Sequence, residues 1–142
     1  MRVLDQSRIG AVLNGVPDAL KGGPPVMAML MQNANSAEVA PDTALVRRGL
    51  AREDLFLAVQ EQFMTATARF ADILLPATTF VEHDDLYASY GHTYLAFGPK
   101  LIEPPGEARS NHWVRCEIAK RLGATHPDLA MSERQQIDDA FE

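Results

Sequence analysis

The sequence predicts an α/β fold in which a mostly parallel sheet lies between helices in three layers. Three apolar runs of strand length, at residues 26–31, 55–59 and 73–75, carry this prediction. Each run is nearly uninterrupted, which is typical of strands buried on both faces under helices. Segments with helical spacing separate the runs, and a strand–helix–strand order favours right-handed crossovers and parallel pairing.

Composition limits the class of protein. The 142 residues fit one domain, and the formal net charge of −6 argues against nonspecific nucleic-acid binding, which requires an excess of Lys and Arg. The single cysteine, Cys116, excludes an internal disulfide and a multi-cysteine metal or iron–sulfur site. No apolar stretch reaches the length of a membrane span. We therefore expect a soluble chain without membrane insertion, and favour the cytoplasm.

The N-terminal third starts with a weak helical pattern. Ile9, Val12 and Leu13 have helical spacing, and we interpret residues 1–24 as a surface connecting helix followed by a loop. The apolar run at 26–31 ends in amide and hydroxyl residues at 32–36, which either form a turn or present amides to a ligand. Asp42 is the expected N-cap of the next helix.

The central stretch of the chain runs from Leu55 to Glu82. Its first apolar run stops at Gln60 and Glu61, and Thr65 then favours a short helix over 65–71. The second apolar run ends at Pro76, because proline cannot donate a hydrogen bond within a sheet. Open α/β sheets bind ligands at the carboxyl ends of their strands, so Gln60 and Glu61 are candidate binding residues.

The segment 78–105 has few helix or strand signals, and a loop of this length is often functional. Its histidines and acids lack the spacing of a metal site, so we assign no metal ligand. Residues 94–97 indicate a short strand. Ser110 is the expected N-cap of a helix that ends at Gly123, and Ser132 is the expected cap of a last helix over 131–141.

Several sequence motifs of catalysis and nucleotide binding are absent. No Gly-x-Gly-x-x-Gly follows a strand, and neither a Walker loop nor Gly-x-Ser-x-Gly is present. We therefore assign no catalytic residue.

A set of ordered landmarks points to a family. They are Glu61, Thr-x-Thr-Ala at 65–68, Ala-Asp at 71–72, Leu-Pro at 75–76, Glu82 and Pro-Gly-Glu-Ala-Arg at 105–109, with Asn-x-Asn and Ala-Pro-Asp upstream. In this order they resemble the molybdopterin oxidoreductases, the family of dimethyl sulfoxide reductases, formate dehydrogenases and nitrate reductases. The resemblance covers roughly residues 25–123.

The resemblance implies a Rossmann-like α/β unit, the third of four domains in that family. In relatives this unit binds one guanine dinucleotide arm of bis(molybdopterin guanine dinucleotide), which carries molybdenum or tungsten in the full-length enzyme. Carried over by position, the cofactor-binding residues are Asn33, Asn35, Gln60, Glu61, His83 and Asn111. Many relatives have Asp at the position of Glu61, Pro at that of Ser36 and Lys at that of His83.

The chain is too short for a whole enzyme of this family, so we expect a fragment. We divide its single α/β domain, 1–142, into a connecting helix and loop (1–24), a dinucleotide-binding core (25–123) and a C-terminal helix (124–142). The expected partners are the remaining domains of the same enzyme and an electron-transfer subunit. Alone, the fragment is expected to be inactive and to hold no cofactor. The alternative is a structural or interaction module of the same fold that binds no cofactor.

Overall fold

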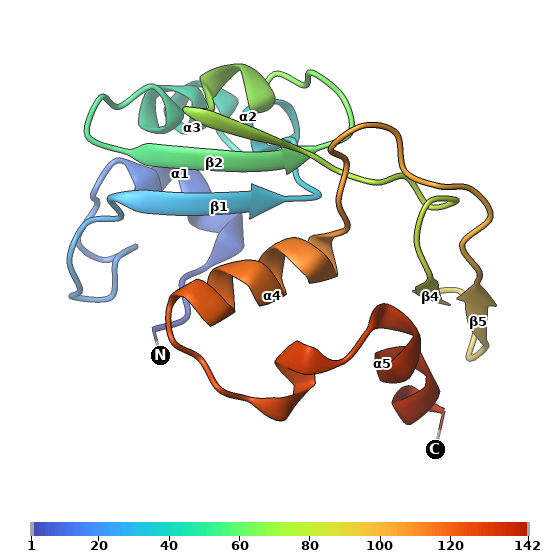
Figure 1. Cartoon of the computed structure of the whole chain (residues 1–142). Coiled ribbons are helices and arrows are strands. Elements are labelled where there is room, and N and C mark those ends of the chain that lie inside the picture. Colours follow the sequence, from blue (N-terminus) through green and yellow to red (C-terminus); the bar gives the residue numbers. More distant parts are fainter. Residues whose placement is uncertain (1, 142) are drawn as a thin grey trace. The chain divides into compact units, whose positions relative to one another are not determined.

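The chain forms two compact units, with the boundary in the sequence between Leu75 and Pro76. The structure is a computed structural model, which describes residues 2–141. The first unit contains, in order, η1 (Gln6–Arg8), α1 (Ile9–Leu13), β1 (Ala28–Gln32), α2 (Ser36–Val39), α3 (Thr43–Leu50), β2 (Phe56–Glu61), η2 (Ala68–Phe70) and β3 (Ile73–Pro76) (Figure 1). The second contains β4 (Asp85–Ala88), β5 (Leu95–Gly98), α4 (Asn111–Arg121), η3 (Pro127–Ala130) and α5 (Glu133–Ala140).

The sheet of the first unit has the strand order β1-β2-β3, with β2 in the middle. β1 pairs with β2 in parallel and in register, from Ala28 opposite Phe56 to Gln32 opposite Gln60. Asp72 attaches the start of β3 to β2, because its carboxylate accepts a 2.7 Å hydrogen bond from the Leu57 N–H and its own N–H donates to the Leu57 carbonyl at 2.9 Å. The α/β class and the parallel sheet built from the three apolar runs are thus confirmed.

The core of the first unit lies between the sheet and its helices. Alternate strand residues, Met31, Leu57 and Val59, join one apolar cluster to which α1, α2 and α3 all contribute. Burying a side chain of this size stabilises the fold by about 1.5–3 kcal/mol. Leu30 and Phe56 occupy the alternate positions of the strands, and they are 37% and 49% exposed.

The N-terminal helix belongs to this core. Leu13 of α1 is fully buried, and Ile9 is also in the cluster. The interpretation of this helix as a surface connector was therefore wrong. The apolar face that its spacing predicted is real, but it faces α3 and the sheet rather than solvent. Arg52 also links the helix to the segment before β1, because its guanidinium donates to the carbonyls of both Leu13 and Val26.

Two glycines allow α1 and α3 to approach closely. A Cβ at Gly49 would lie 2.5 Å from the Leu13 Cβ, which is closer than a Cβ approaches any heavy atom to which it is not bonded. A Cβ at Gly10 would lie 3.2 Å from the Leu45 side chain, so it would require only a small displacement. α3 itself starts as predicted at Asp42, whose carboxylate accepts a 3.2 Å hydrogen bond from the Leu45 N–H.

The second unit is built from one hairpin and two capped helices. β4 and β5 pair antiparallel, from Asp85 opposite Gly98 to Ala88 opposite Leu95. Ser110 caps α4 by accepting from the Trp113 N–H at 3.2 Å, and Ser132 forms a capping box with Gln135 at the start of α5. Both predicted caps are confirmed.

Three predicted boundaries differ from the structure. The predicted loop 78–105 contains the hairpin, whose first strand, β4, was not predicted. The polar segment after β1 contains α2, a single helical turn too short to show a helical period. The helix expected over 65–71 is the short 3₁₀ turn η2, although Thr65 does accept a hydrogen bond from the Ala68 N–H at 3.2 Å.

No helix within residues 2–141 combines the length and the apolar character that crossing a membrane requires.

The contact between the two helices predicts that Gly49→Ala lowers the free energy of unfolding. The added methyl group overpacks the contact with Leu13, at a cost of about 1–3 kcal/mol, which exceeds the gain in helix propensity of about 1 kcal/mol at most. Chemical unfolding followed by circular dichroism measures the change. Gly10→Ala is the matched control and should cost less, since its new Cβ has more room; equal losses in both variants would contradict this packing argument.

Candidate functional site

The carboxyl ends of β1 and β2 carry adjacent amide side chains. The two arrowheads point the same way in Figure 1, so the strand ends lie at one edge of the sheet. Gln32 and Gln60 stand opposite each other there, and the Gln32 amide donates to the Gln60 side-chain carbonyl. Gln60 is only 1% exposed. Because a buried amide needs hydrogen-bond partners, this pair helps to hold the edge together.

The loop after β1 is tied to the loop after β2. The Asn35 side-chain carbonyl accepts from the Thr67 N–H at 3.2 Å and from the Thr67 hydroxyl at 2.9 Å, and its amide donates to Glu38. The same hydroxyl accepts from the Ala37 N–H at 3.0 Å. Thr67 is fully buried, so these bonds are shielded from water. Asn35 is therefore a structural residue of this edge.

Asn33 and Glu61 lie closer to solvent at the same edge. Asn33 is exposed and has a left-handed backbone, with φ of 55°, a conformation that asparagine tolerates better than most residues. Glu61 is the last residue of β2 and is partly exposed. Its carboxylate accepts a 2.8 Å hydrogen bond from the Gln62 N–H, and a carboxylate can accept about four.

Four of the six residues assigned from the sequence thus gather at one edge of the first unit: Asn33, Asn35, Gln60 and Glu61. Their gathering follows from parallel pairing, which brings the strand ends together. His83 and Asn111 belong to the second unit. That all six surround one crevice stays a prediction.

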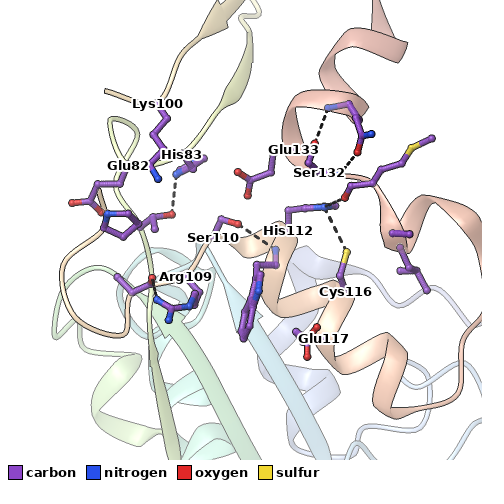
Figure 2. A pocket seen from close by; sticks show the side chains of 18 of the residues that line it. Glu82, His83, Lys100, Arg109, Ser110, His112, Cys116, Glu117, Ser132 and Glu133 are labelled. Atoms are coloured by element: carbon purple, nitrogen blue, oxygen red, sulfur yellow. Dashed lines mark hydrogen bonds between the residues drawn. The ribbon is translucent and has the colours of Figure 1, made fainter. Parts of the chain in front are cut away.

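The second unit contains a cavity of about 620 Å³ with both polar and apolar lining, and His83 is one of the residues that line it (Figure 2). His83 Nδ1 is hydrogen-bonded to the Thr78 hydroxyl at 2.8 Å, and its Nε2 lies 3.8 Å from the Asp85 carboxylate. Asn111 is the first residue of α4, directly after the capping Ser110. The Thr78 contact and the nearby carboxylate fix the direction of the imidazole ring of His83.

Charges of both signs line this cavity. Lys100 pairs with Glu103 at 2.7 Å, and Lys120 pairs with Glu117 at 3.2 Å. Glu117 also accepts from Arg121, and the hydrogen bonds from Arg121 and then Lys120 hold the pKa of its carboxyl below the usual range. Since each lysine has a carboxylate partner, the cavity is not strongly cationic.

Farther along α4 the cavity wall has a second imidazole. His112 Nε2 is hydrogen-bonded to the Met131 carbonyl at 2.9 Å, and the Cys116 sulfur lies 3.6 Å from the same nitrogen (Figure 2). Within residues 2–141, no three His, Cys, Asp or Glu side chains are grouped so that they could hold a metal ion. Cys116 lies on this helix and is buried, as expected for a small packing residue.

The cofactor-binding residues assigned from the sequence did not include two residues of the sheet edge, Gln32 and Thr67. Gln32 directly follows a predicted strand, so its position was a usable signal, but its partner Gln60 becomes evident only from the strand register. Thr67 is part of the Thr-x-Thr-Ala landmark, and its bond to Asn35 joins positions 32 residues apart.

The comparison with known proteins decides the family. Residues 9–121 match the model of the molybdopterin oxidoreductases. The chain belongs to this family. The match starts within α1, in agreement with the burial of that helix in the core of the first unit.

Relatives of the family are much longer than this chain. Probable oxidoreductase YoaE of Bacillus subtilis is 38% identical over 141 residues, which are 99% of this chain and 20% of that protein. A nitrate reductase of Symbiobacterium thermophilum is 36% identical over 69% of this chain and 13% of its own length. The structure of acetylene hydratase from Pelobacter acetylenicus superposes with a TM-score of 0.67 and 25% identity, over 81% of this chain and 15% of that one. The chain therefore spans a fifth or less of each.

The bonds of Thr67 predict that Thr67→Val loosens the sheet edge. Valine keeps the shape but leaves the Ala37 N–H and the Asn35 carbonyl without this partner, at a cost of about 1–3 kcal/mol for a buried polar group. Hydrogen exchange measured by NMR should show loss of protection at the Ala37 amide. Thr67→Ser keeps the hydroxyl and should keep that protection; an Ala37 amide equally protected in both variants would show that the bond does not hold the loop.

Proposed function

We propose that this chain is the cofactor-binding domain of a larger molybdopterin-dependent oxidoreductase and holds one guanine dinucleotide arm of bis(molybdopterin guanine dinucleotide). The observation that carries the proposal is the cluster of amides and one carboxylate at the carboxyl edge of a parallel sheet. Ligands of open α/β sheets bind at this edge. Membership of the family supports a pterin cofactor with molybdenum or tungsten.

The donor set at the edge suits a guanine nucleotide. The guanine base presents two neighbouring N–H donors on one edge, and the partly exposed carboxylate of Glu61 can accept from both. Asn33 is exposed beside it and can bond a ribose or a base edge. Asn35 and Gln60 are bonded within the protein, and their part is to fix the loops that carry the other two.

The printed names of the relatives also support a cofactor role. One relative is named a nitrate reductase and a structural neighbour an acetylene hydratase, two different reactions. A domain shared by both is better explained by a common cofactor than by a common substrate. When bound, the cofactor supplies the redox chemistry at its metal, and the residues of this chain bind and orient it. The remaining domains of the same polypeptide and an electron-transfer subunit complete this proposal.

The proposal predicts that the chain binds GDP weakly and that Glu61→Gln weakens binding further. The amide keeps the shape but replaces one acceptor oxygen with a donor, so the loss is about 1–3 kcal/mol. Isothermal titration calorimetry measures it, with ADP as the ligand control, because adenine lacks the two neighbouring donors. Glu53→Gln changes another acidic residue of the same unit and should leave the affinity unchanged. A chain that binds no GDP would contradict the proposal and favour a structural module without cofactor.

We also expect the purified chain to be inactive by itself. Its candidate residues bind and orient a cofactor, and none of them is placed to carry out oxidation or reduction. Assays with formate, nitrate and a sulfoxide, each with an artificial electron carrier, check this expectation. Turnover by a homogeneous preparation of the 142-residue chain with bound metal would contradict it.

A further inference from the structure

Two large apolar side chains stand in solvent directly beside the polar edge of the sheet. Phe63 and Met64 follow β2 after only Glu61 and Gln62, and they are 72% and 60% exposed. A single exposed apolar residue is ordinary on a protein surface. Of the two, only Phe63 carries a flat aromatic ring, and small-molecule sites combine such apolar groups with a few polar ones like those of this edge.

The loop that carries Phe63 is fixed at both of its ends. It starts at Glu61, at the end of β2, and it ends at Thr67, which is buried and bonded to Asn35. Between them the Thr65 N–H donates to the Phe63 carbonyl at 2.8 Å, so the backbone of Phe63 is held as well. The phenyl ring is thus exposed although its backbone has a fixed place at the sheet edge.

From this placement we propose that Phe63 is the base-stacking residue of the site and packs its ring against the face of the purine whose edge Glu61 binds. The inference rests on the proposed function. Two residues of extended chain span about 7 Å at most, so a base bonded edge-on to Glu61 lies within reach of the Phe63 ring. The carboxylate reads the donors of the base, and the ring supplies affinity through stacking, which does not depend on the identity of the base.

The other occupant of such a surface would be a neighbouring protein domain. An apolar contact with protein needs volume and area, and leucine supplies both. Stacking on a base needs a flat ring, which leucine lacks and tyrosine keeps. The two explanations therefore predict opposite outcomes for Phe63→Leu and Phe63→Tyr.

The test is titration of the full chain with GDP, by calorimetry and by NMR of the guanine H8 proton. Phe63→Ala and Phe63→Leu should each lower the affinity about tenfold, the usual effect of losing one stacked aromatic ring. Phe63→Tyr should stay within about twofold, and so should Met64→Ala, the control for apolar surface on the same loop.

The H8 signal should shift upfield on binding to the unchanged chain and lose that shift with Phe63→Leu. Since Phe63 is mostly exposed, these variants should fold, and thermal unfolding verifies it.

The outcomes separate this inference from the function on which it rests. GDP affinity unaffected by Phe63→Ala would overturn the stacking role and leave the proposed function standing. Full affinity in Phe63→Leu would overturn it too, and assign the ring to an apolar contact. If the unchanged chain binds no GDP, both the proposed function and the stacking role are contradicted.

Discussion

The parallel pairing of β1 with β2, in register, is the constraint on which the candidate site depends. It places Gln32 opposite Gln60 at the last step of the ladder, where the two amides bond to each other. An antiparallel pair would carry these residues to opposite ends of the sheet. Because Gln60 is almost fully buried, a lost partner would cost about 1–3 kcal/mol. The same pairing that builds the core therefore also assembles the polar edge.

Polar residues of this edge have two distinct tasks. Thr67 and Asn35 are committed to each other, and their bonds hold the two loops that leave the sheet. Asp72 has a comparable role at the start of β3, since its carboxylate accepts from the Leu57 N–H and so holds the chain against β2. Glu61 and Asn33 remain accessible on the frame so formed. A rigid frame that presents a few accessible polar groups is what binding with orientation requires.

The second unit is organised differently, by local hydrogen bonds more than by a core. Up to residue 141, the buried apolar residues of this unit have small or medium side chains, such as Val114 and Ile137. Its helices begin at Ser110 and Ser132, each of which caps the N–H three residues ahead. Around its cavity, most charged side chains are matched within a few residues of the chain. Local bonding of this kind fixes individual elements and leaves a cavity between them.

The sequence by itself determined the features that depend on neighbouring residues. Continuous apolar runs specified β1, β2 and β3, and the side chains of Asp42, Ser110 and Ser132 specified helix starts, because a cap bonds only three residues ahead. The family, too, could be inferred from landmarks in their order. Only the tertiary structure decided which polar residue meets which, and that the N-terminal helix is buried. Thr67 reaches Asn35 across 32 residues, and Gln32 reaches Gln60 across 28. Such partners follow from the strand register and from the path of the segments that connect the strands. No local pattern of residues encodes the register or this path.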